Sequence, residues 1–207
     1  PVFMTGGVKA IGAEEQKMQD AYMRLKYAQV PVVTAVSGMA LGGGCELILH
    51  SAKTVAALES YIGLVEIGVG LVPGAGGLKE GALRAAQAAH AAGATDVFPF
   101  MKNWFLNVAM ANVSKYALEA KSMGYLRPSD TIVFNNHELL WTAVGEAYAL
   151  HATCWRPPLK PLGFPVAGRT GVATIKAQLV NMRDGGFISA HDYHIASGIA
   201  EVMCGGD

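Results

Sequence analysis

Two glutamates beside glycine-rich turns are the residues of this chain best suited to acid–base chemistry. Glu46 ends the run 42–46, and Glu66 stands just before the glycine-rich run 68–77. One carboxyl group can accept a proton while the other donates one, and the N–H groups of a glycine turn can hold a developing negative charge. This equipment is suited to hydrating a polarised double bond.

Each of these residues also has a purely structural interpretation. The triplet 42–44 could be a tight turn that needs positive φ, and an isolated triplet most often is one. Glu46 could complement a helix dipole, and Glu66 could be an exposed turn acid. The apolar run 62–65 before Glu66 instead predicts a raised pKa for its carboxyl group. The residues alone leave both interpretations open.

The run 74–77 is not a nucleotide-binding loop. It is not followed by the Gly-Lys-Ser/Thr of a phosphate-binding loop, and it lacks the spacing of a dinucleotide site. We expect it to let the chain enter the next helix closely packed behind Glu66.

The string from Pro31 to Glu46, PVVTAVSGMALGGGCE, resembles the signature of the enoyl-CoA hydratase/isomerase (crotonase) family. The resemblance is specific over 30–80. The tail through 187–194 and 204–206 is similar to a narrower group, in which a 3-hydroxyacyl-CoA dehydrogenase module precedes a hydratase module. The resemblance implies the crotonase (ClpP/crotonase-like) spiral fold, an α/β fold with a stacked pair of small sheets, here partial and with a helical C-terminal half. The family's first strands, which help to hold the adenine end of CoA, are expected to be missing from this chain, which starts at Pro1.

The resemblance also implies roles for residues of the site. Glu46 and Glu66 stand where hydratases of the family keep their catalytic pair. Gly43, beside Gly44, would supply one N–H donor for the thioester oxygen. The second donor would be the N–H of Met4, ahead of the first helix. Gly74, in the second glycine run, would help to bind the substrate.

The implied reaction is the hydration of a trans-2-enoyl-CoA to the 3-hydroxyacyl-CoA, as in fatty-acid β-oxidation. The coenzyme A thioester is the substrate, and the reaction needs no cofactor and no metal. Two alternatives stay open: double-bond isomerisation or another crotonase reaction, and a truncated inactive module with a structural role. The pair of glutamates favours hydration, because isomerases and hydrolases of the family usually keep only one of the two.

Composition limits the partners that we expect. Lys plus Arg equals Asp plus Glu, so the net charge is zero and no basic field for nucleic acid exists. Only 15% of the residues are charged, against roughly 25% in an ordinary domain, which favours a homo-oligomer or part of a larger chain. No membrane span or signal peptide is recognised, and three unpaired cysteines indicate a cytoplasmic protein.

Histidines elsewhere do not form a convincing metal site. His191 and His194 have i, i+3 spacing but no third ligand nearby, so we expect a solvated helix start. His151 and Cys154 could form a nucleophile pair, but nothing in the sequence orients the histidine.

The pattern of apolar residues predicts one domain over 1–207, with an α/β active-site region at 1–95 and a mainly helical region at 96–207. Ser114 is expected to be an N-cap, and the proline-rich segment 156–165 a loop. The expected helices are 14–29, 45–51, 78–92, 97–110, 114–123, 138–151, 172–182 and 190–203, and the expected strands are 32–36, 53–58 and 131–134.

Overall fold

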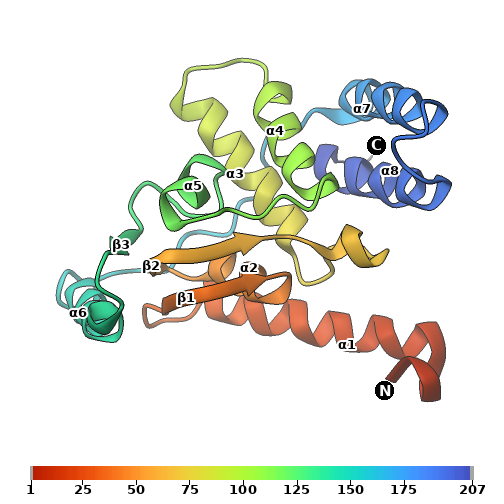
Figure 1. Ribbon diagram of the computed structural model, residues 1–207. Coiled ribbons are helices and arrows are strands. Elements are labelled where there is room, and N and C mark those ends of the chain that lie inside the picture. The colour runs from red at the N-terminus through yellow and green to blue at the C-terminus, as the bar shows by residue number, and fades with distance from the viewer. Residues whose placement is uncertain (1, 206–207) are drawn as a thin grey trace.

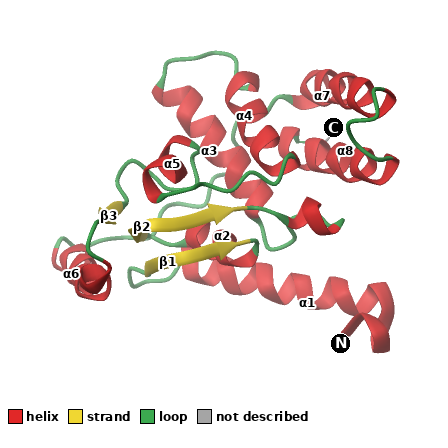
Figure 2. Cartoon of the chain, viewed as in Figure 1, coloured by secondary structure: helices red, strands yellow, loops and turns green. Residues whose placement is uncertain are grey.

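The computed structural model describes residues 2–205 as a small parallel sheet surrounded by helices (Figure 1). Figure 2 shows the strands near the centre of the molecule, with α1 along one side and most of the later helices on the other. The elements are α1 (Val2–Lys26), β1 (Val33–Leu41), α2 (Gly43–His50), β2 (Lys53–Gly63), the 3-10 helix η1 (Glu66–Val69), α3 (Gly77–Ala91), α4 (Phe98–Ala109), α5 (Ala117–Ser122), β3 (Thr131–Val133), the 3-10 helix η2 (Asn136–Glu138), α6 (Leu139–Ala152), α7 (Gly168–Asp184) and α8 (Ala190–Cys204).

The three strands are parallel and lie in the order β1-β2-β3. Helix α2 connects β1 to β2, which is the crossover connection that a parallel pair requires. The register pairs Val33 with Lys53 at one end and Leu41 with Gly63 at the other, with a shift between Val36 and Gly38. Both strands therefore end at the same edge of the sheet.

One large apolar core joins the sheet to the helical half. Helices α2, α3, α4 and α8 supply most of its buried side chains. Many of the buried α3 residues are alanine, including Ala82, Ala85 and Ala89, so neighbouring helices can approach closely. A smaller cluster, formed by Val55, Ala57, Val133 and Ala143 with partly buried Val33 and Leu139, holds α6 against the sheet.

Most of the predicted elements are present, but four expectations need correction. The first two strands are longer than predicted, since β1 continues to Leu41 and β2 to Gly63. The first helix covers Val2–Lys26 rather than 14–29, with a kink at Gly7, where φ is 63°. Only one sheet is present within residues 2–205, not a stacked pair. Ser114 is not an N-cap: its hydroxyl accepts a hydrogen bond from the Ile62 N–H, and α5 begins after Tyr116. The hydrogen bond of Ser114 instead connects the loop before α5 to the end of β2.

The segment between α6 and α7 contains no helix or strand, as expected for the proline-rich stretch. Within residues 2–205, none of the helices combines the length and the apolar character that a membrane span requires.

Candidate active site

The candidate site lies at the edge of the sheet where β1 and β2 end. The chain leaves β1 through Gly42, whose N–H donates to the Gly63 carbonyl, the last residue of β2 (2.9 Å). Gly42 has φ of 54°, a left-handed conformation that favours glycine, and α2 begins at the next residue. Glu46 lies one turn into α2, and Glu66 lies three residues past β2. Parallel pairing thus brings the two glutamates to one edge.

The Glu46 carboxylate is buried and held by the backbone at the start of α3. Its Oε1 accepts hydrogen bonds from the Gly77 N–H (2.8 Å) and the Ala75 N–H (3.0 Å). A Cβ at Gly77 would lie 3.0 Å from Oε1, so only glycine gives this approach without a shift. Burial raises the pKa of Glu46, the two N–H donors oppose that shift, and the charge of Glu66 adds to it. Glu46 therefore has a fixed orientation and a raised affinity for protons.

The Glu66 side chain lies against the turn that begins α2. A Cβ on Gly42 would lie 3.2 Å from Glu66 Oε1, so the carboxyl group is packed directly over the turn backbone. Its Oε2 is buried and has no hydrogen-bond partner among the described residues. Burial raises the pKa of Glu66, as predicted from the apolar run before it. An unpartnered, buried carboxyl oxygen with raised pKa is suited to holding a transferable proton.

Gly43 is the first residue of α2, so its N–H has no acceptor within the helix. On the other side of this residue, the Tyr22 hydroxyl donates a hydrogen bond to the Gly43 carbonyl (3.0 Å). The Tyr22 ring also lies against the buried His50 ring, with centroids 5.4 Å apart. His50 Nδ1 is in turn 2.7 Å from the Glu46 carbonyl. Tyr22 and His50 together fix the backbone of the first turn of α2.

Helix α1 also contacts the second glycine turn. Gln19 Nε2 donates to the Gly74 carbonyl (2.6 Å), and a Cβ on Gly74 would lie 2.9 Å from Glu15 Oε1. Glu15, Gln19 and Tyr22 are spaced i, i+4 and i+7, so they lie on one face of α1. That face holds both glycine turns of the site.

Gln19 and Tyr22 are not among the site residues predicted from the sequence. Tyr22 also belongs to the apolar stripe of this helix, together with Met18 and Leu25, and its hydroxyl partner is remote in the sequence. The spacing of Glu15, Gln19 and Tyr22 was the available signal, because it places three polar groups on one side of the helix.

The structure does not test the predicted role of Met4. This residue lies in the first turns of α1, within the helix rather than ahead of it, and Figure 1 shows this end of α1 extending beyond the sheet. Its role as a second N–H donor stays a prediction. A cavity of about 540 Å³ borders the turn at Gly74 and includes Gln19, but neither Glu46 nor Glu66 is in its lining. A cavity shared by both glutamates also stays a prediction.

The histidines that were considered as metal ligands lie elsewhere. His191 and His194 are in the first turns of α8, where Ser189 and Asp192 form a reciprocal cap, so the predicted helix start is confirmed. His191 Nε2 lies 3.2 Å from the Gly70 carbonyl. Among the described residues, no group of three His, Cys, Asp or Glu side chains could hold a metal ion.

Comparison with known families agrees with this geometry. Residues 4–95, which include both glutamates and both glycine turns, match the family described as enoyl-CoA hydratase/isomerase. The match covers the α/β part of the chain and confirms the resemblance that the sequence indicated: this region belongs to the enoyl-CoA hydratase/isomerase (crotonase) family.

Two longer proteins are similar to this chain. A Bacillus subtilis protein named "Probable 3-hydroxyacyl-CoA dehydrogenase" is 41% identical over 191 residues, which are 92% of this chain and 23% of that protein. The fatty acid oxidation complex subunit alpha of Colwellia psychrerythraea is 41% identical over 68 residues, 33% of this chain and 9% of that protein. The chain therefore spans less than a quarter of the length of either relative.

Solved structures show the same fold. The enoyl-CoA hydratase of Bacillus anthracis superposes with a TM-score of 0.54 at 19% identity, covering 97% of this chain and 64% of that one. Pseudomonas aeruginosa DspI gives a TM-score of 0.56 at 18% identity, covering 90% of this chain and 64% of that one. The chain has the crotonase fold, with a parallel sheet and a helical C-terminal half.

Proposed function

We propose that this chain hydrates a trans-2-enoyl-CoA to the corresponding 3-hydroxyacyl-CoA. The observation that carries the proposal is the pair of glutamates at one edge of the sheet. The Glu46 carboxylate is fixed by two backbone N–H donors, and the Glu66 carboxyl is packed over the turn that begins α2. An isomerisation needs only one group that moves a proton, whereas hydration uses an acid and a base.

Each group has one task in the proposed reaction. Glu46 orients a water molecule and takes its proton as the hydroxyl oxygen bonds to the β-carbon. Glu66 delivers its proton to the α-carbon. The Gly43 N–H stabilises the negative charge that the thioester oxygen carries between these events, and such a donor contributes roughly 3–4 kcal/mol. The enzyme is restored when Glu46 loses its proton and Glu66 regains one.

The direct test is the loss of crotonyl-CoA absorbance on adding the purified chain. Glu66→Gln keeps the shape of the side chain but removes the transferable proton, so the rate should fall by roughly 10²–10⁴. Glu46→Gln should cause a loss in the same range. Binding of a saturated acyl-CoA should change little in either variant, because that ligand never develops the enolate charge.

The matched control is Glu59→Gln, an exposed carboxylate on β2 outside the site, which should leave the rate unchanged. A wild-type chain without hydration activity, or a Glu66→Gln variant as fast as the wild type, would contradict the proposal.

We also propose that the chain acts beside a 3-hydroxyacyl-CoA dehydrogenase activity, in a larger protein or assembly. This step is supported by the name of the Bacillus subtilis relative and by chemistry, since the hydration product carries the hydroxyl group that such an enzyme oxidises. An added 3-hydroxyacyl-CoA dehydrogenase should therefore produce NADH from crotonyl-CoA only when this chain is present. NADH formation without the chain, or none with it, would contradict this part.

A further inference from the structure

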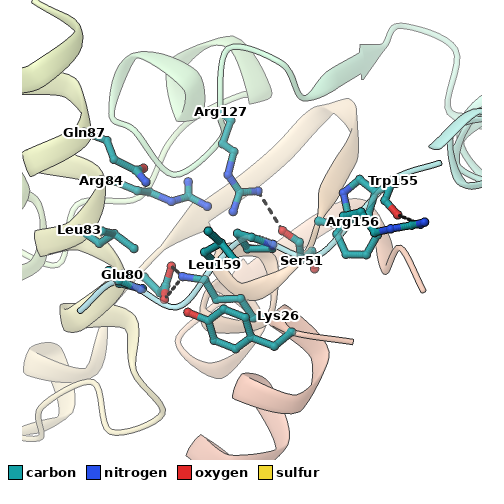
Figure 3. A pocket seen from close by; sticks show the side chains of 14 residues that line it. Lys26, Ser51, Glu80, Leu83, Arg84, Gln87, Arg127, Trp155, Arg156 and Leu159 are labelled. Carbon is teal, nitrogen blue, oxygen red and sulfur yellow. Dashed lines mark hydrogen bonds and ion pairs between the residues drawn. The ribbon is translucent and has the colours of Figure 1, made fainter. Parts of the chain in front are cut away.

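A cavity of about 350 Å³ lies at the end of α2 remote from the glycine turn (Figure 3). Its walls come from the end of α1, the residues after α2, one side of α3, Arg127 and the segment 155–161. Neither glutamate of the candidate site is part of its lining.

The charges around this cavity do not balance. Four lining side chains are cationic, Lys26, Arg84, Arg127 and Arg156, and Glu80 is the one carboxylate of the lining. The Glu80 carboxylate forms an ion pair with Lys26, whose Nζ lies 2.6 Å and 2.7 Å from its two oxygens. None of the three arginines has a carboxylate within ion-pair distance in residues 2–205. The wall is therefore strongly positive.

Two of the arginines are held by backbone carbonyls rather than by acids. Arg84 donates to the carbonyls of 124–125 (2.9 Å and 3.0 Å) and Leu49 (3.2 Å). Arg127 donates to the carbonyls of Ser51 (2.9 Å) and Leu49 (3.3 Å). These contacts explain their positions, since cations near the last carbonyls of a helix are stabilising.

The helix end does not neutralise both guanidinium groups. A helix C-terminus carries about half a negative elementary charge, against two full positive charges here. Arg84 Nε is buried without a hydrogen-bond partner among the described residues. The charge of Asp130 acts on Arg84, but its oxygens accept hydrogen bonds from two backbone N–H groups rather than from a guanidinium group. Burial, and then the charge of Arg127, lower the pKa of Arg84 to about 10. An excess of positive charge therefore remains at the cavity wall.

We propose that this cavity binds a phosphoryl group, either free or as part of a small phosphorylated molecule. The fork of a guanidinium group matches phosphate oxygens, and Arg127 keeps N–H donors that its two carbonyl contacts do not use. The volume is larger than a phosphate ion needs and falls at the lower end of small-ligand pockets. Trp155 and Leu159 on the outer wall offer apolar surface for an attached organic group (Figure 3).

The test is calorimetric titration of the intact chain with inorganic phosphate and with ADP, at constant ionic strength. The informative variant is Gln87→Glu, because Gln87 is exposed on α3 and lines the cavity, so the change adds a negative charge to the wall without removing a described contact. The affinity of Gln87→Glu for phosphate and for ADP should fall at least tenfold relative to the wild type. Gln178→Glu is the matched control: it makes the same chemical change at an exposed position of α7 outside the cavity, and should stay within twofold of the wild type.

Three results would overturn the proposal. They are the absence of saturable binding of both ligands by the wild type, an equal loss in the two glutamine variants, and binding of adenosine as tight as that of ADP. Equal affinity for phosphate and ADP would support a site for the free anion, and at least tenfold tighter ADP would support a larger phosphorylated ligand. The thermal unfolding of both glutamine variants is measured as well. An unfolding temperature equal to that of the wild type shows that a loss of binding does not come from a loss of the fold.

Discussion

Tyr22 shows how one hydroxyl group can set the geometry of the turn that begins α2. Its O–H holds the Gly43 carbonyl, and the orientation of that peptide carries over to the neighbouring N–H groups of the turn. Replacing Tyr22 by Phe keeps the ring contact with His50 and removes only the hydrogen bond. We expect the turn to be less well oriented but still formed.

The first prediction follows for Tyr22→Phe. A lost hydrogen bond costs about 1 kcal/mol of stability, and we expect kcat for crotonyl-CoA to fall about tenfold, which corresponds to about 1.4 kcal/mol of transition-state stabilisation. KM should change little, because the ligand itself loses no contact. Tyr148→Phe on α6, where the ring is exposed, is the control. An unchanged kcat in Tyr22→Phe would show that the hydroxyl does not position the turn.

The second prediction concerns Glu46 and pH. Because the folded protein raises the pKa of Glu46, it binds the proton more tightly than the unfolded chain does. Ionised Glu46 therefore weakens folding as pH rises from its ordinary pKa, about 4.3, through the raised value. A glutamine can accept the same two N–H bonds without the charge. Glu46→Gln should thus gain stability over the wild type, and the gain should be larger at pH 8 than at pH 4.

Urea unfolding at the two pH values measures this difference, with Glu59→Gln as the exposed control. A gain that is independent of pH would contradict the assignment of Glu46 as a buried acid with raised pKa. We expect Glu46→Gln to be more stable than the wild type but inactive. This is the trade-off between stability and activity expected where a site keeps a buried charge for function.

At the scale of elements, the approach of the two glutamates could be predicted from the sequence, but the details of their contacts could not. A β-branched run, a glycine turn, a helix and a second run predict a parallel crossover, and this brings Glu46 and Glu66 to one edge. The bonds from Glu46 to the backbone at Gly77 depend on where α3 begins in space. That position is set by packing of the whole helical half, which no local pattern encodes.

Helix α1 was predicted too short for a related reason. The apolar stripe that marks it starts near residue 14, and the residues before it include Gly6, Gly7 and Gly12, which have poor helix propensity. The structure continues the helix across them with a kink at Gly7.

The third prediction tests the attachment of α1 to α3. Glu80 is buried, and burial alone would raise its pKa, but the ion pair and hydrogen bonds with Lys26 lower it. Lys26→Met leaves this buried carboxylate with the half-exposed Lys79, 3.0 Å away, and the His50 imidazole, 3.7 Å away. We expect a loss of about 3 kcal/mol in the free energy of unfolding, as for other broken buried pairs.

The matched control for that loss is Lys17→Met, which breaks an exposed pair with Glu14 on the same helix. Exposed pairs contribute about 0–1 kcal/mol. Adding Glu80→Gln to Lys26→Met should recover part of the loss, because the buried charge that lost its main partner is then removed. Equal losses for Lys26→Met and Lys17→Met would mean that the buried pair does not fasten α1.

At the scale of the whole molecule, exposed apolar side chains gather on α6 rather than on the C-terminal helices. The amphipathic pattern of the last two helices predicts that another subunit, or missing parts of a parent chain, would cover α7 and α8. Instead they pack on each other, and α8 also packs on α3 and α4. Within the described parts of α7 and α8, Val202 is the large hydrophobic side chain that is exposed.

Helix α6 has the opposite character. Its inner face packs on the sheet through Leu139 and Ala143, while Leu140, Trp141 and Tyr148 are 70%, 82% and 73% exposed. Their spacing places them on one side of the helix. Such a patch on a chain of zero net charge favours association.

The last prediction is that this side of α6 mediates self-association of the purified chain. The mass measured by light scattering should rise with concentration in the wild type. Trp141→Lys places a charge at the most exposed side chain of the patch and should shift the association to at least tenfold higher concentration. Val202→Lys makes the same kind of change on α8 and should leave the mass unchanged. A wild-type chain that stays monomeric, or equal effects of the two lysines, would contradict the prediction, because an apolar face that drives association must respond to a charge placed within it.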